Sequence, residues 1–471
     1  MKQQLSLVFA AALFAATPAL AADSPSSSGS SQVPYNCDFS PACEVAPGVY
    51  GNLQAPTTSK FNLSIGGFVK LDYAYNSANL GPNGFLTATD APKNSSQPGQ
   101  KDQSTLDARA SRLWFKSNGP TLLGAKTTAL LELDFYNSQV TNASNLEAFN
   151  AAPRMRHAYA NLDWGNTQLL FGQTGENFGL FNANTVDFNA GIQFGYNNGY
   201  REPQIRLTQK VDLTPANSFK FVLAVEQPTQ TNYNNNGTNV AAGNTVGGST
   251  TGDSWGALPN FVGQALFVSK ALGSSPTQYG YAQQNFTTGF FGVYGNQHAL
   301  GQTNDKTIDT WGVGYYSFVP ILASVDGKSR ANTLTFEGQA YIAANFAGNV
   351  AAQYTGTAGN LQPAKGFGVA TQLLYYPTQN LSLNTGYGRR EAYNYSAYAN
   401  SGINNYERYN QTFFANVFYD LNAAVRVGAE YQHVDTRYGH VTNITTAGSA
   451  LAGLSDYGKV NTARLALYYF F

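Results

Sequence analysis

Charged residues are scarce in this chain, and neither sign of charge is in excess. Only 11% of the 471 residues are charged, whereas soluble chains typically carry about 25%. Lysine plus arginine number 27 and aspartate plus glutamate also number 27, so the formal net charge is zero. A nucleic-acid partner requires a basic patch or stripe. The balance of charge provides no such signal, so we expect no nucleic-acid partner.

Long apolar runs are missing beyond the N-terminus. No later segment contains the roughly 18 uninterrupted apolar residues that a transmembrane helix needs. The chain is instead rich in glycine, with 47 residues, and in tyrosine and phenylalanine, with 30 each. A β-barrel with lipid outside and water inside has this kind of composition. Its outer face is apolar, its lumen is polar, and aromatic residues gather at both membrane interfaces.

The first 21 residues fit an export signal. Lys2 gives a basic start, the stretch 5–20 is largely apolar, and Ala19-Leu20-Ala21 fits a small-x-small cleavage site. The apolar run ends too early to span a bilayer, which favours a cleaved signal peptide over an uncleaved anchor. We therefore expect residues 1–21 to be removed on export.

Cysteine is nearly absent, and both cysteines lie close together in a segment of unusual composition. Residues 22–60 are rich in Ser, Pro, Ala and Gly, which predicts a loosely ordered periplasmic segment. An oxidising periplasm favours a disulfide between Cys37 and Cys43, although so short a loop gives little entropic stabilisation. Two thiolates without a nearby histidine are only half a zinc site, and the haem motif Cys-x-x-Cys-His is absent. We expect no metal and no cofactor.

The last ten residues show the pattern that recurs through the rest of the chain. Leu465 and Leu467 alternate with Arg464 and Ala466, and the chain ends at Phe471. Successive side chains point to opposite sides of a strand, so one side of this strand is apolar and the other carries a charge. A strand of this kind that ends on an aromatic carboxy-terminus, in an exported chain, resembles the closing strand of bacterial outer-membrane proteins.

About sixteen alternating runs can be counted over residues 61–471, an even number as single-chain bacterial barrels require. Short turns alternate with long polar connections, which is typical of outer-membrane barrels. The predicted fold class is therefore all-β: a transmembrane antiparallel β-barrel of about 16 strands, with short periplasmic turns and long extracellular loops. Two of the short turns, near 272–283 and 320–330, are longer than this scheme predicts. The runs are 61–75, 107–117, 123–136, 153–164, 167–175, 202–212, 217–227, 260–271, 284–296, 307–319, 331–345, 365–376, 380–391, 409–420, 423–436 and 458–471.

Charged residues within these runs are predicted to face the lumen. In the second run Arg112 and Lys116 share a face, and in the third Glu132 and Asp134 oppose the apolar Leu131. A charge on the lipid face costs ~2–4 kcal/mol at the membrane midplane. The alternative is an interior in which these charges simply pair across strands. Sixteen strands leave an aqueous channel, which favours a water-filled lumen.

The stretch 174–201 follows the fifth run and contains Glu176 and Asp187. At this position it resembles the loop that folds inward and narrows the channel in general porins, although an outward surface loop is the alternative. The resemblance implies that these acidic residues face a basic wall, and acid facing base creates a field that orders polar solutes. Two members of that wall, Arg154 and Arg156, are close in sequence to His157 and Tyr159, which could equally face the lumen. The wall would be drawn from Arg112, Lys116, Arg154, Arg156, Arg201 and Arg206.

Five short motifs narrow the resemblance. Together they are similar to the DcaP-like trimeric porins, well over about residues 61–212 and afterwards only in strand rhythm and the terminal Phe. The resemblance implies a homotrimer in the bacterial outer membrane that passes small, often negatively charged, organic solutes. Some members have an N-terminal coiled coil, which needs sustained heptads that this chain lacks. The motifs are Ile65-Gly66-Gly67-Phe68-Val69-Lys70-Leu71-Asp72, Ala110-Ser111-Arg112-Leu113-Trp114-Phe115-Lys116, Arg154-Met155-Arg156-His157-Ala158-Tyr159, Phe171-Gly172-Gln173-Thr174 and Pro203-Gln204-Ile205-Arg206.

The sequence therefore predicts a porin for passive diffusion of ions and small polar solutes, with a slight preference for anions. A substrate-specific channel is the alternative. An outer-membrane enzyme is a competing class, since His433 and His440 lie close to Asp435. No Gly-x-Ser-x-Gly or His-Glu-x-x-His motif supports catalysis, so we expect no enzyme. A surface anchor is a third class, but none of the loops is long enough to form a folded passenger domain.

Overall fold

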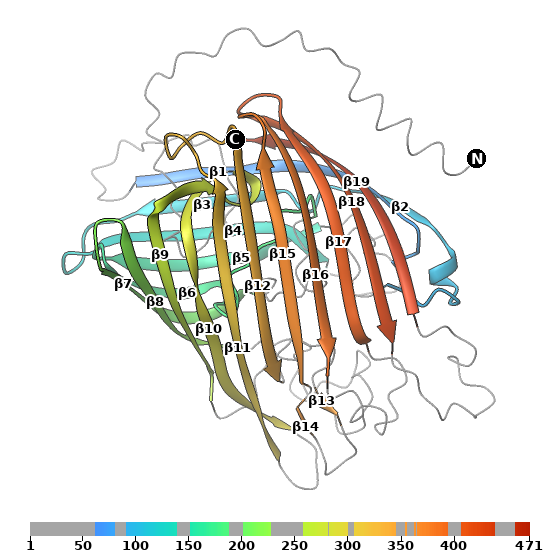
Figure 1. The fold of residues 1–471 in the computed structure, drawn as a ribbon, viewed down its shortest axis with the longest axis horizontal. Helices are drawn as coiled ribbons and strands as arrows, with labels where there is room; N and C mark the ends of the chain where they lie inside the picture. Colours follow the sequence, from blue (N-terminus) through green and yellow to red (C-terminus); the bar gives the residue numbers. More distant parts are fainter. Residues whose placement is uncertain are drawn as a thin grey trace. The chain divides into compact units, whose positions relative to one another are not determined.

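Antiparallel strands form one closed barrel in the computed structural model (Figure 1). The structure describes residues 62–80, 91–138, 151–187, 201–227, 258–280, 282–299, 306–344, 354–355, 362–363, 365–393, 407–438 and 457–471. The main sheet contains 17 strands. Because β2 and β3 pair with successive halves of β1, they occupy one position, which leaves a barrel of 16 strand positions.

Successive strand positions alternate in direction around the barrel, with β2 and β3 running the same way at their shared position, and the described connections include two short 3-10 turns. The barrel strands are β1 (Asn62–Asn76), β2 (Gln103–Asp107), β3 (Arg112–Asn118), β4 (Lys126–Ser138), β5 (Ala151–Asp163), β6 (Thr167–Gly175), β7 (Arg201–Asp212), β8 (Asn217–Glu226), β9 (Asn260–Pro276), β10 (Gln283–Ala299), β11 (Lys306–Leu322), β12 (Thr333–Ala344), β15 (Lys365–Tyr376), β16 (Leu381–Ala392), β17 (Glu407–Asp420), β18 (Val425–Tyr438) and β19 (Tyr457–Phe470). A separate two-stranded pair is formed by β13 (Tyr354–Thr355) and β14 (Gln362–Pro363), and the 3-10 turns are η1 (Pro98–Gln100) and η4 (Gln278–Gly280).

The barrel closes where the first strand meets the last. β1 pairs with β19 from Phe68 opposite Phe470 to Asn76 opposite Thr462. The backbone of Gly67 exchanges two hydrogen bonds with the terminal residue, Phe471, each 3.1 Å long. A closed barrel satisfies the backbone groups of its strands within the sheet, which is what a hydrocarbon environment requires.

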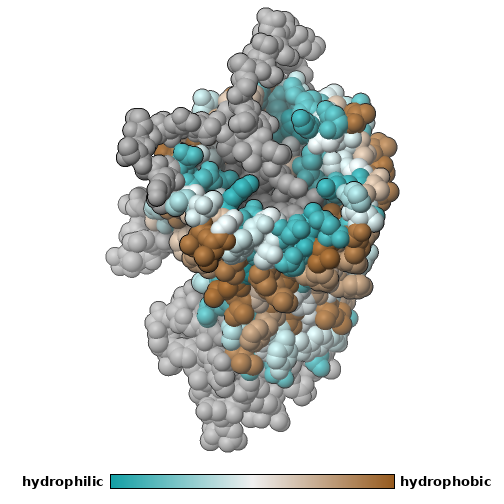
Figure 2. Space-filling view, turned by 90° about the vertical axis from the view of Figure 1, so that its left-hand side faces the viewer, coloured by the Kyte–Doolittle hydropathy of each residue, from teal (hydrophilic) through white to brown (hydrophobic). Residues whose placement is uncertain are grey.

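Side chains alternate between an apolar outer face and a polar inner face. In β19, Arg464 is 1% exposed inside the barrel, whereas Leu467 and Tyr469 are 52% and 56% exposed on the outer face. Figure 2 shows hydrophobic residues gathered on the outer surface, with hydrophilic residues above them. The face that the sequence pattern assigned to lipid is therefore the exposed apolar face of the barrel.

The predicted fold class is confirmed, and the sixteen predicted runs correspond to the sixteen strand positions. Three details differ. The run 107–117 is interrupted at 108–111, where Ser111 Oγ accepts a 3.0 Å hydrogen bond from the Lys70 amide. The two connections expected to be short turns, near 272–283 and 320–330, are longer because they contain strand, since β9 continues to Pro276 and β11 to Leu322.

In the part of the chain that the structure describes, no helix has the length and apolarity needed to cross a membrane. Residues 1–21, the segment 22–60 and the Cys37–Cys43 pair lie outside the described residues, so the signal peptide and the disulfide stay predictions.

Candidate functional site

The chain that follows β6 turns into the barrel and runs along its inner wall. We call residues 176–187 the inner belt. Its first contacts are with β7, β8 and β9. The side chain of Asn177 donates to Gln204 at 2.7 Å and to Glu226, and the backbone carbonyl of Asn177 accepts from Gln264 Nε2 at 2.7 Å. The belt therefore begins with bonds to three successive strands beyond the one it leaves.

Amide side chains from the wall hold the middle of the belt. The amide of Leu180 donates to Gln339 Oε1 on β12 at 3.0 Å. On β15, Gln372 makes two such bonds: it accepts from the Asn184 amide at 2.8 Å and donates to the Asn182 carbonyl at 2.7 Å. Buried backbone groups need partners, and here side chains replace a neighbouring strand. The belt is thereby kept extended against the wall.

An aromatic cluster fixes the same stretch by packing. Phe178, which is fully buried, meets Phe291 and Tyr341 edge-on, with ring centroids 5.0 and 5.6 Å apart. The ring lies over Gly312 of β11, where an added Cβ would come within 2.6 Å of it. The absence of a side chain at Gly312 thus allows the belt to approach the wall closely.

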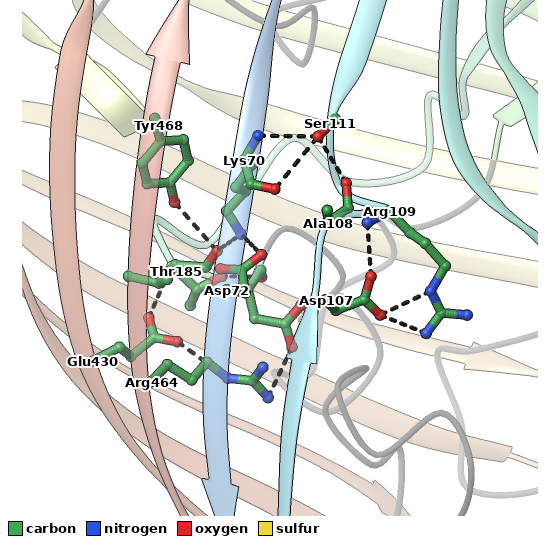
Figure 3. Close-up of polar contacts among 12 residues, drawn as sticks. Lys70, Asp72, Asp107, Ala108, Arg109, Ser111, Thr185, Glu430, Arg464 and Tyr468 are labelled. Atoms are coloured by element: carbon green, nitrogen blue, oxygen red, sulfur yellow. Dashed lines mark hydrogen bonds and ion pairs between the residues drawn. The ribbon is translucent and has the colours of Figure 1, made fainter. Parts of the chain in front are cut away.

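The far end of the belt is held by charged residues from the strands that close the barrel. The amide of Val186 donates to Glu430 of β18 at 2.7 Å, and its carbonyl accepts from Lys70 Nζ of β1 at 2.8 Å. Figure 3 shows Lys70, Glu430 and Tyr468 converging on this end of the belt. The belt therefore extends from β6 along the inner wall to β18 and β1.

The belt ends in an ion-pair network that is almost completely buried (Figure 3). Asp187 lies 3.3 Å from Arg464 of β19, and Arg464 lies 3.9 Å from Glu430. Next to them, Lys70 and Asp72 form an ion pair of 2.7 Å. Buried charges are tolerated only when they are paired and hydrogen-bonded, so these residues must act as a unit.

A second charged cluster lies on the inner faces of β3, β4 and β5. Arg156 donates to Glu132 at 2.7 Å and to Asp134 at 3.0 Å. Arg154 binds Asp134 with two hydrogen bonds, of 2.9 and 2.6 Å, and Arg112 lies 3.6 Å from Glu132. The two carboxylates are at most 1% exposed, whereas Arg154 is 39% exposed. The solvent-facing part of the cluster is therefore cationic.

A β-bulge explains why the alternating pattern predicted competing residues for this inner face. Glu132 pairs with His157 and the next residue, Leu133, pairs with Met155, so Arg156 is an extra residue in β5. A bulge re-aims side chains, and here Arg156 and His157 are both buried inside the barrel, at 2% and 0% exposure. The arginine and histidine positions are therefore both internal.

The remaining predicted site residues are more scattered. Arg206 donates to Asn177 Oδ1 of the belt at 2.7 Å, and Glu176 is buried where the belt begins. Lys116 shares the inner face of β3 with Arg112 and is partly exposed. Arg201 is the first residue of β7; its side chain is half-buried, its Nε is buried, and its charge acts on His157, which lies inside the barrel.

Asp187, at the end of the belt, has an ion-pair partner outside the predicted basic wall. Asp187 pairs with Arg464, and the arginines of the second cluster pair with Glu132 and Asp134 on their own wall. Sequence reasoning did not select Lys70 or Arg464 as site residues. The signal was present, since both are charged residues on the inner faces of the first and last strands.

The histidines give little support to a catalytic site. The ring of His433 lies on the outer face of β18, where Nδ1 is 2.8 Å from Asn461 Oδ1. His440 lies outside the described residues. Within the described ranges, no cluster of histidine, cysteine, aspartate and glutamate has the arrangement of a metal site.

No family model matches the chain, and no curated protein sequence matches it. Solved structures are similar to it in fold. One is the outer membrane channel DcaP of Acinetobacter baumannii, with a TM-score of 0.62 at 18% identity over 88% of this chain and 99% of that one. Another is the anion-selective porin from Comamonas acidovorans, with a TM-score of 0.50 at 8% identity over 87% and 100% of the two chains.

The fold is that of outer-membrane porins. The resemblance inferred from the sequence motifs is confirmed at the level of fold, because the chain matches nearly the whole length of the DcaP channel.

Proposed function

We propose that this protein is an outer-membrane porin, a water-filled channel for passive diffusion of ions and small polar solutes. The observation that carries the proposal is a closed barrel of 16 strand positions with an apolar outer face and charged residues inside. Barrels of sixteen to eighteen strands leave an aqueous channel, whereas eight strands are filled by side chains. The inner belt takes up part of this lumen.

The proposal includes a slight preference for anions. The carboxylates of Glu132 and Asp134 are buried against their arginine partners, and Arg154 is the exposed member of this charged cluster on β3, β4 and β5. Solutes that pass this wall meet a positive potential, which raises the local concentration of anions. A cleaved signal peptide and a homotrimer, both expected from the sequence, complete the proposal.

Single-channel recording tests the central claim. The purified protein, reconstituted into planar bilayers, is expected to give stable ohmic conductance steps, in groups of three if the protein is a trimer. A general channel shows no saturation by individual solutes, whereas a substrate-specific channel is blocked by its solute at low concentration. A folded barrel that gives no conductance above that of the empty bilayer would refute the proposal.

Reversal potentials under a salt gradient test the sign of selectivity. The parent protein is expected to prefer anions slightly, and Arg154→Gln should shift the reversal potential toward cation preference, because it removes the exposed positive charge. Arg389→Gln is the matched control, since Arg389 forms an ion pair of 2.6 Å with Glu391 on the outer face of β16. Strong cation preference of the parent would contradict the proposed sign.

A further inference from the structure

The pairing of β9 with β10 is irregular near the short-turn end of the barrel. Phe286 lies opposite Ser269, but the preceding residue, Asn285, lies opposite Ser274. Residues 270–273 are thus looped out of the pairing, and an irregularity of this kind bends a hairpin. We call the hairpin end beyond it, residues 274–280 and 282–285, the tongue.

The base of the tongue contacts β12 and the connection that follows β11. Thr335 Oγ1, on the inner face of β12, donates to Ser275 Oγ at 2.7 Å, and both side chains are fully buried. The amide of Ser324, in the connection after β11, donates to the Ser274 carbonyl at 2.7 Å. The hairpin that leaves β9 therefore crosses β11 to reach the inside of β12.

The tip of the tongue is Tyr279, and it touches the inner belt. Its amide donates to Asn184 Oδ1 at 2.8 Å and its hydroxyl donates to the Thr185 carbonyl at 3.0 Å. The ring meets Phe418 of β17 edge-on at 6.1 Å, and the Tyr279 carbonyl accepts from Arg426 of β18 at 3.0 Å. One residue of a short turn thus contacts the belt and two strands far from its own.

The backbone at Tyr279 adds a second observation. Its φ is +59°, in the left-handed region that is uncommon for a bulky residue. Such conformations persist where surrounding contacts determine them, and they cluster at functional sites. The contacts of Tyr279 with the belt, β17 and β18 hold its backbone in this conformation.

We infer that the tongue constricts the channel near its short-turn end, in addition to the inner belt, and that Tyr279 fixes the tongue against the belt. The inference rests on the proposed channel function and adds to it. The tongue and the belt together limit the size of the solutes that pass. Tyr279 is a specificity-determining residue because it sets the position of both elements.

Replacement of the tongue by a tight turn provides the direct test. Since Ser269 lies opposite Phe286, residues 270–285 can be exchanged for Asn-Gly, the usual two-residue hairpin turn. Pore diameter determines conductance and size selection, so conductance should rise about twofold or more, and liposomes should swell in larger sugars than the parent admits. Unchanged conductance and an unchanged sugar cut-off in the folded variant would overturn the inference.

A point variant covers the case in which the replacement does not fold. Tyr279→Ala removes both the ring and the hydroxyl and should raise the conductance and the open-channel noise. Tyr419→Ala is the matched control, because Tyr419 lies on the outer face of β17 and is 42% exposed. Equal effects of the two substitutions would reject the inference. Failure of the parent itself to conduct would instead reject the proposed function.

Discussion

Arg464 shows how one side chain can hold the inner belt in place. It is almost completely buried, it pairs with Asp187 at 3.3 Å, and it lies 3.9 Å from Glu430. Arg464→Gln would remove a buried cation from beside the carboxylates of Asp187 and Glu430. Removal of one partner from a buried ion pair typically costs ~3–5 kcal/mol. We expect a loss of this size in the free energy of unfolding, measured by urea titration in detergent micelles.

Arg389→Gln is the control for this residue-scale prediction. Its ion pair with Glu391 lies on the outer face, and both side chains are more exposed than those around Arg464, at 29% and 20%. Exposed or partly exposed pairs contribute about 1 kcal/mol or less. Similar losses in both variants would show that the Arg464 network does not stabilise the fold through buried charge.

At the scale of elements, the belt depends on a missing side chain. An added Cβ at Gly312 would come within 2.6 Å of the Phe178 ring, and Gly312→Ala should therefore displace the belt from β11. Overpacking of this kind typically costs about 1–3 kcal/mol. The displaced belt should also change the single-channel conductance, because it lies inside the lumen. Conductance and the urea midpoint are the two measurements.

Gly263→Ala is the matched control for the belt variant. The same added atom at Gly263 of β9 has Leu223 as its nearest contact, at 3.9 Å, which is ordinary van der Waals distance. We expect parental conductance and stability from this variant. An unchanged conductance in Gly312→Ala, in a folded protein, would count against the belt as a part of the channel.

The strands were predictable from sequence because each carries its own alternating pattern. Arg464 and Leu467 face opposite sides, as the pattern indicated. The bulge at Arg156 was not predictable, because an extra residue shows only against its partner strand. The partners of the belt were also hidden, since the bond from Leu180 to Gln339 joins residues 159 positions apart. The tongue gave only an indirect signal, an unusually long turn.

At the scale of the whole molecule, every element depends on closure of the sheet. β19 pairs with β18 on one side and with β1 on the other, and the belt ends on Arg464 and Lys70 of the closing strands. Closure and the charged network are therefore coupled. Loss of the last strand exposes two strand edges and removes the residues that hold the far end of the belt.

Truncation of the chain after Leu465 tests the dependence on strand closure, because it shortens β19 and keeps Arg464. It removes the β19 residues that pair with positions 68–72 of β1 and 425–428 of β18. Unpaired strand edges are not tolerated in the hydrocarbon region, because the backbone groups there have no other partner. The truncated chain should fail to give the faster-migrating folded band in unheated gel electrophoresis. Deletion of six residues from 228–257, between β8 and β9, leaves all described strand pairs intact and should preserve that band. A folded, conducting truncation would show that the barrel does not need residues 466–471 to close.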